Sequence, residues 1–153
     1  MRFELQIRIE RPAHDVFAYV SDVTHLPEWQ ESAVAAEWIE PGRRFRERRN
    51  FLGRTAELEL EVTASDPDRR FDVKAVKGPV RFEIRHEFAA NGDGTLLRVD
   101  AEAALGGALR LAAGMAKRQA ERQFRSDLER LKEVLERRDE ESPSDRPPRL
   151  AVE

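Results

Sequence analysis

The chain has 153 residues, enough for a single domain with one sizeable core. Its 27 basic and 30 acidic residues give a net charge of −3, which argues against the strongly basic surface that nucleic-acid binding requires. The absence of cysteine excludes disulfides, thiolate nucleophiles and cysteine metal sites. No segment approaches the ~20 apolar residues of a membrane span, and the N-terminal ten residues lack a signal-peptide core, so we expect a cytoplasmic protein.

The start of the chain predicts one strand followed by two short helices. Apolar and polar or charged residues alternate over residues 3–10, which is the period of a strand with one buried face. Pro12 suits the first position of a helix whose apolar face extends to Val20. A second short helix is expected over residues 25–30, with Trp29 as its anchor.

Six further alternating runs follow, separated by turn residues. The run Asn91-Gly92-Asp93-Gly94 is the strongest hairpin signal, because its residues tolerate positive φ. The short connections between the runs favour an antiparallel sheet with one face in water. The expected strands cover residues 34–40, 44–51, 56–63, 71–77, 80–88 and 97–103.

From Gly107 onward the apolar period changes from 2 to 3.6, which predicts a long amphipathic helix ending near Arg138. About 30 residues would form a rod of roughly 45 Å, long enough to cross a whole sheet and cover its other face. Residues 139–153 are polar and contain several prolines, so we interpret them as a disordered tail. The predicted domain therefore comprises residues 1–138. The apolar stripe of the helix consists of Leu109, Ala112, Ala116, Ala120, Phe124, Leu128, Leu131 and Leu135.

Four segments carry a resemblance to a known family: RPAHDVFAYVSDVTHLPEW, RRNFLGRTAELELEV, NGDGTLLRV and FRSDLERLKEVLERR. In their order and spacing they resemble the START-like or Bet v1-like superfamily (SRPBCC), and within it the bacterial polyketide cyclase/dehydrase-like branch. The resemblance implies an α+β helix-grip fold, in which a curved seven-stranded antiparallel sheet wraps around the long C-terminal helix. It also implies a cavity for an apolar or amphipathic small molecule, and it transfers no catalytic residue.

Small residues dominate the faces that the sheet and the long helix would turn toward each other. Such residues either leave volume for a ligand or simply permit close approach of helix and sheet. The resemblance favours a cavity, and we expect no cofactor and no metal in it. The candidate ligand-binding residues are Trp29, Phe45, Arg49, Leu58, Phe82, His86, Ala101, Met115, Ala116 and Gln119.

His86 is the candidate catalytic residue, because its parity with Phe82 and Ile84 points it inward. Imidazole titrates near neutral pH and is a natural proton shuttle or hydrogen-bond partner for a ligand. The alternative is a buried neutral histidine bonded to a backbone carbonyl. His14 and His25 are expected at the surface, and the three histidines lack the spacing of a metal site.

The basic run of residues 43–49 raises a question of parity. If Phe45 faces inward, Glu47 and Arg49 share its side; with the opposite parity, arginines such as Arg46 face inward. Because unpaired buried charge is costly, this strand is expected at a sheet edge or beside a wet cavity mouth. In the second case Arg46 or Arg49 would anchor a ligand carboxylate or phosphate.

The favoured function is binding of a small hydrophobic molecule by a carrier or sensor, acting as a monomer or homodimer. One alternative is a polyketide cyclase or aromatase, for which His86 with Glu47 or Arg49 is the cluster to nominate. Whether these side chains meet in the cavity depends on the register of the strands that carry them. A third possibility is a protein-interaction module, which an exposed apolar patch beside the short helices would favour.

Overall fold

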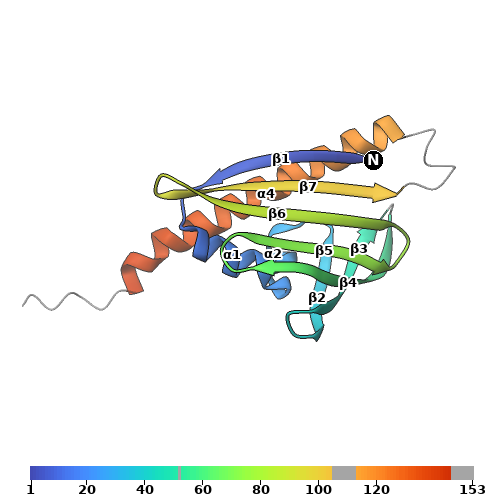
Figure 1. Cartoon of the computed structure of the whole chain (residues 1–153), viewed down its shortest axis with the longest axis horizontal. Helices are drawn as coiled ribbons and strands as arrows, with labels where there is room; N and C mark the ends of the chain where they lie inside the picture. The colour runs from blue at the N-terminus through green and yellow to red at the C-terminus, as the bar shows by residue number, and fades with distance from the viewer. Residues whose placement is uncertain (52, 105–112, 146–153) are drawn as a thin grey trace, which may run out of the picture.

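The computed structural model describes residues 1–51, 53–104 and 113–145. Seven strands form one antiparallel sheet in the order β1-β7-β6-β5-β4-β3-β2, which confirms the helix-grip prediction. Figure 1 shows the long helix α4 crossing the sheet on the same side as the short helices. The elements in chain order are β1 (Arg2–Ile9), α1 (Ala13–Ser21), the 3₁₀ helix η1 (Val23–His25), α2 (Leu26–Trp29), β2 (Ala33–Glu40), β3 (Arg44–Phe51), β4 (Arg54–Asp66), β5 (Arg70–Lys77), β6 (Arg81–Asn91), β7 (Gly94–Ala104) and α4 (Ala113–Asp145).

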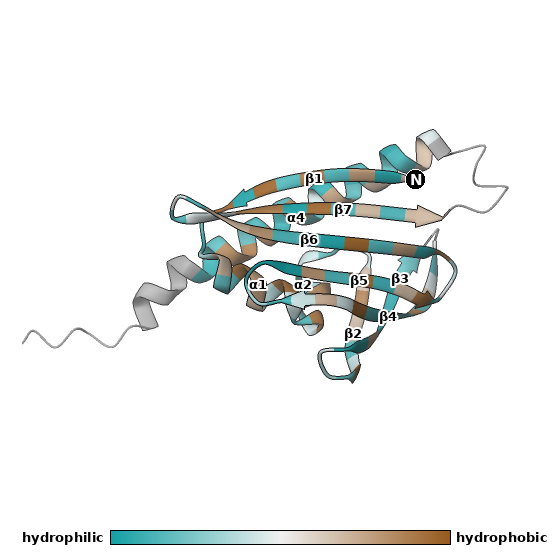
Figure 2. Cartoon of the chain, in the orientation of Figure 1, coloured by the Kyte–Doolittle hydropathy of each residue, from teal (hydrophilic) through white to brown (hydrophobic). Residues whose placement is uncertain are grey.

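The alternation of the strands becomes an inner apolar face and an outer charged face, visible as alternating colours in Figure 2. On β1, Phe3, Leu5 and Ile9 are buried, whereas Arg2 and Glu4 face water. Charged side chains on the outer face pair across neighbouring strands, as in the contacts from Arg2 and Arg85 to Asp100. The sheet therefore needs cover on one face alone, and the helices supply it.

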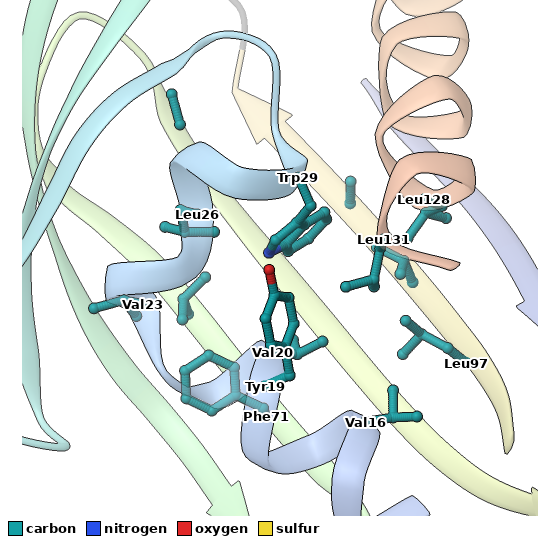
Figure 3. Close-up of a cluster of buried hydrophobic side chains, with 14 of the residues drawn as sticks. Val16, Tyr19, Val20, Val23, Leu26, Trp29, Phe71, Leu97, Leu128 and Leu131 are labelled. Carbon is teal, nitrogen blue, oxygen red and sulfur yellow. The ribbon is translucent and has the colours of Figure 1, made fainter. Parts of the chain in front are cut away.

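The short helices lie against the inner face and join the core. Val16, Val20 and Trp29 are almost fully buried there, and Trp29 is the anchor that the sequence predicts. Figure 3 shows the side chains of this segment gathered beside those of α4 and the sheet, with Leu131 on the α4 side. The segment from α1 to α2 thus fills part of the space between sheet and long helix.

Helix α4 is buried unevenly along its length. Leu128, Leu131 and Leu135 are fully buried, but Met115 in the first turns is exposed. The second half therefore packs tightly against the core, while the first half leaves room above the sheet. The expected start of the helix near Gly107 lies outside the described residues.

Two sequence predictions need correction. The helix does not end near Arg138 but continues to Asp145, so part of the expected tail is helical; residues 146–153 lie outside the described part of the chain. Strand β3 is not at a sheet edge, because it pairs with β2 on one side and β4 on the other. Among the described residues, no helix combines the length and apolar character that crossing a membrane requires.

Candidate functional site

A cavity of about 210 Å³ lies between the inner face of the sheet, the η1–α2 segment and the first half of α4. Its walls are mostly apolar, and its polar members are Gln30, Glu47, Arg49, His86 and Glu102. Of the candidate ligand-binding residues, the structure brings seven into these walls. They are Trp29, Phe45, Arg49, Leu58, Phe82, His86 and Ala101.

The three remaining candidates, Met115, Ala116 and Gln119, do not line the cavity, and helix α4 instead contributes Ala120 and Phe124. Met115 is 76% exposed, and the exposed Gln119 accepts a hydrogen bond from Arg122 on the helix surface. Met115 and Gln119 are one turn apart, so they share a solvent-facing stripe. Ala116 lies on the inward stripe but one turn too close to the helix start.

Strand β3 has the parity in which Phe45, Glu47 and Arg49 face inward. The Arg49 guanidinium donates one hydrogen bond to each carboxylate oxygen of Glu47, from Nε to Oε1 and from Nη2 to Oε2, each at 3.1 Å. Arg49 also donates from Nη1 to the Ser32 hydroxyl at 2.6 Å and from Nη2 to the Gln30 Oε1 atom at 2.5 Å. Glu47 is only 2% exposed, so this pair supplies the charge compensation that a buried carboxylate needs.

The same polar cluster reaches helix α4 through Asp127. The Asp127 Oδ1 atom accepts hydrogen bonds from the Glu31 backbone N–H at 3.2 Å and from the Gln123 amide at 2.9 Å. Burial raises the pKa of Asp127 above its ordinary value of 3.8, while these bonds and the Arg49 charge oppose the shift. The charges at this end of the cavity are therefore one guanidinium among several carboxylates.

His86 lies in the cavity wall and is buried. Its Nδ1 atom is 2.8 Å from the Phe71 carbonyl oxygen, and since a carbonyl only accepts, Nδ1 carries the proton. Burial lowers the pKa of His86 below 6.5, although the bond to Phe71 and the charge of Asp72 oppose this. The ring is therefore neutral at pH 7, and Nε2 is a hydrogen-bond acceptor.

Strand register separates His86 from the Arg49 cluster. Glu47 pairs with Leu58 on β4, whereas His86 pairs with Phe71 on β5. Three two-residue steps lie between them, or about 20 Å of strand length. No hydrogen bond or ion pair joins His86 to Glu47 or Arg49 in the described part of the chain, although all three residues line the same cavity. The two intervening rows contain Leu60 with Ala75 and Val62 with Val73.

The sequence reasoning missed several wall residues, of which Gln30 matters most chemically. Gln30 follows the last residue of α2 and is 7% exposed, and no periodic signal in the chain distinguishes it. Glu47 is already indicated by its parity with Phe45, and the structure confirms that both side chains face inward. Trp29 adds a buried indole N–H that has no acceptor among the described residues.

A family model described as polyketide cyclase/dehydrase and lipid transport matches residues 1–136. The chain belongs to this family. No curated protein matches the chain significantly. The family description joins two kinds of activity, so membership by itself does not distinguish a catalyst from a carrier.

Solved structures agree with the family in fold. A START superfamily protein from Mycobacterium smegmatis superposes with a TM-score of 0.75 at 19% identity, covering 89% of this chain and 97% of that one. A protein from Thermus thermophilus gives 0.77 at 18% identity, covering 88% and 97%. The Zhui aromatase/cyclase from a Streptomyces species gives 0.74 at 18% identity, covering 90% and 94%. The superpositions, rather than the low identities, show that these proteins share the fold of this chain.

Proposed function

We propose that the protein binds one small hydrophobic or amphipathic molecule in the cavity between the sheet, the short helices and α4, as a carrier or sensor. The observation that supports this is a space of about 210 Å³ with mostly apolar walls and a polar cluster at one end. An engineered apolar cavity of about 150 Å³ accepts benzene. A ligand of roughly naphthalene size therefore fits, although the cavity is smaller than the ~300–1,000 Å³ of typical ligand pockets.

The first experiment is native mass spectrometry of the purified protein, followed by denaturing extraction of any bound molecule. A stoichiometric apolar compound is the expected result, and it identifies the ligand chemistry directly.

The second experiment places a bulky residue in the cavity and compares it with the same change one turn away. Ala120→Trp fills the cavity from α4 and should reduce naphthalene binding at least tenfold in a fluorescence titration. Ala116→Trp, outside the walls, should leave binding unchanged. Equal naphthalene affinity in both folded variants would refute this location for the site.

A cyclase or aromatase remains the second candidate, because His86 presents an unprotonated ring nitrogen in an apolar cavity wall. Such a nitrogen can remove a proton from a bound ligand. The compound recovered from the protein is incubated with the wild type and with His86→Ala. Conversion by the wild type alone supports the enzyme, whereas equal conversion by both, or by neither, refutes this role for His86.

The cavity walls all come from one chain, so a monomer suffices for binding. Light scattering on the eluting protein distinguishes this from a homodimer.

A further inference from the structure

The chemistry of the polar end specifies what kind of polar group the ligand carries. Arg49 has the only cationic side chain in the cavity wall, within the described part of the chain, and Glu47 occupies it through two hydrogen bonds. The N-terminal ammonium group of Met1, which also lines the cavity, donates to the Ala103 carbonyl oxygen. The remaining bonds of Arg49 go to the oxygens of Ser32 and Gln30. A ligand carboxylate would have to displace an existing carboxylate from this guanidinium.

The carboxylates around the cluster oppose an anion further. Asp127 lies near enough to Arg49 for the two charges to interact, and Glu31 lies close to Asp127. Gln123 bridges these last two acids through its amide nitrogen, at 2.9 Å from Asp127 and 3.3 Å from Glu31. The Arg49 charge is thus already paired with Glu47 and also interacts with Asp127 behind the cavity wall, so little of it is left to attract a second anion into the cavity.

The cluster nevertheless leaves both an acceptor and a donor open. Each Glu47 oxygen accepts one hydrogen bond from Arg49, and a carboxylate has about four acceptor positions, so two stay open. The Gln30 oxygen accepts from Arg49, which cannot accept in return, and this fixes the amide orientation. The Gln30 NH₂ group then has no hydrogen-bond partner among the described residues, and its side chain lines the cavity.

We infer that the site selects a neutral hydroxyl group, which donates to Glu47 and accepts from Gln30, and that it discriminates against carboxylates. The ligand class is therefore an apolar phenol or alcohol rather than a fatty or aromatic acid. His86, elsewhere in the cavity wall, also favours a hydroxyl over a carboxylate. Its Nε2 atom can accept a hydrogen bond from a hydroxyl, whereas an ionised carboxylate has no hydrogen to donate. This inference rests on the proposed function, since it assigns the chemistry of the same cavity.

Three probes with one ring system test it: naphthalene, naphthol, and the naphthoic acid substituted at the same ring carbon. At pH 7 naphthol is neutral and the acid is ionised, by analogy with the ordinary pKa values of phenols and carboxyls. Wild-type protein should bind naphthol about tenfold more tightly than naphthalene in calorimetry, the factor for one hydrogen bond to a charged group. It should bind naphthoate more weakly than either.

The decisive variant is Glu47→Gln, which keeps the shape of the side chain and removes the charge that occupies Arg49. The ratio of naphthol affinity to naphthoate affinity should fall at least tenfold. The control is Glu57→Gln, an equal change of net charge on the neighbouring strand, where the side chain is 66% exposed. It should leave the ratio unchanged, because only charge inside the cavity decides it.

The results separate a failure of the proposed function from a failure of the hydroxyl assignment. If no probe binds, the proposed function itself is wrong, and this inference with it. If naphthoate binds wild type as tightly as naphthol, or if the ratio is the same in Glu47→Gln, the cavity binds small molecules but the hydroxyl assignment is wrong. If Glu47→Gln fails to fold by circular dichroism, Gln30→Leu replaces it. That variant should lower naphthol affinity severalfold without lowering naphthalene affinity, and an unchanged naphthol affinity would overturn the assignment.

Discussion

Glu47 and Arg49 show how a charged pair is held inside an otherwise apolar space. The two residues are separated by one position on β3, so their side chains leave the same face and meet without a long loop between them. Ser32 and Gln30 then occupy the remaining side of the guanidinium. Removing either charged partner leaves the other without compensation in a nearly dry site.

Arg49→Leu should therefore lower the free energy of unfolding by about 3 kcal/mol, the lower end for a broken buried pair because Arg49 is 20% exposed. Chemical denaturation measures it. Arg48→Leu is the matched control, since Arg48 lies next in sequence and its pair with Glu57 is largely exposed. The control should cost under about 1 kcal/mol. A similar loss in both variants would contradict a special role for the buried pair.

His86 should make the protein less stable in mild acid. Its pKa is lower in the folded protein than in the unfolded chain, so below pH ~6.5 the unfolded chain binds more protons. The contribution of His86 to the free energy of unfolding is then complete above pH ~6.5, and it is lost as the pH falls toward the pKa of the folded protein. Denaturation curves between pH 7 and 5 should show this slope in wild type and a smaller slope in His86→Phe.

Asp127 should act in the opposite direction. Its raised pKa means that the folded protein binds more protons than the unfolded chain just above pH 3.8, so its contribution to stability falls as the pH rises through this window. Asp127→Asn keeps the accepting oxygen for Glu31 and Gln123 and removes the titration. The variant should match or exceed wild-type stability at pH 7, and a large loss there would show that the charge itself is needed.

At the scale of elements, α4 has two functions along its length. Its second half supplies core residues such as Leu131 and Leu135, and its first half supplies only the small cavity wall of Ala120 and Phe124. Among the described side chains, Arg138 joins the helix to α1 and α2, because it lies 4.8 Å from the centre of the Tyr19 ring and 3.6 Å from a Glu28 oxygen.

Removing residues 139–153 should accordingly leave the thermal midpoint within about 2 °C of the full chain, because Leu135 and Arg138 remain. Ending the chain after Glu133 removes both and should cost about 2–5 kcal/mol, the range for losing one buried leucine side chain. Scanning calorimetry of the two shortened proteins checks this. A large loss in the first would show that the domain extends past Arg138.

Elements could be predicted from sequence because their signals are local. The period-2 alternation in residues 56–63 and the change to period 3.6 after Gly107 each depend on neighbouring residues alone. Register and packing depth are not local. Helix periodicity assigns Ala116 and Ala120 to one stripe, yet only the position of the helix over the sheet decides which of them reaches the cavity.

Strand β3 also shows that local sequence does not decide which side chains face the core. Its sequence has charges at both parities, so alternation alone cannot choose a face, and the edge prediction followed from the cost of burying them. In the structure, hydrogen bonds from Arg49 to Gln30 and Ser32 help to stabilise the buried charges. No pattern within residues 44–51 indicates these two partners. The mutual distance of His86 and Glu47 likewise depends on three successive strand pairings, from β3 to β6.

For the whole molecule, the cavity should determine how the protein responds to pressure. Unfolding eliminates internal void volume, and this contributes to the ~20–100 mL/mol decrease that accompanies it. Saturation with naphthalene fills the void and should reduce the measured decrease by some tens of mL/mol. Ala120→Trp should do so without ligand, and Ala116→Trp should not. An identical volume change in all forms, measured by fluorescence under pressure on protein stripped of any bound compound, would contradict a cavity of this size at this position.

The position of β1 in the sheet has a consequence for the protein during its synthesis. Strand β1 pairs with β7, and the partners Arg2 and Glu102 are 102 − 2 = 100 residues apart. A ribosome adds about 5–20 residues per second, so the first strand waits some 5–20 s for its neighbour. Throughout that time the apolar face with Phe3, Leu5 and Ile9 has no native strand beside it. We therefore expect chaperones to bind this nascent segment until β7 has been synthesised and can pair with it.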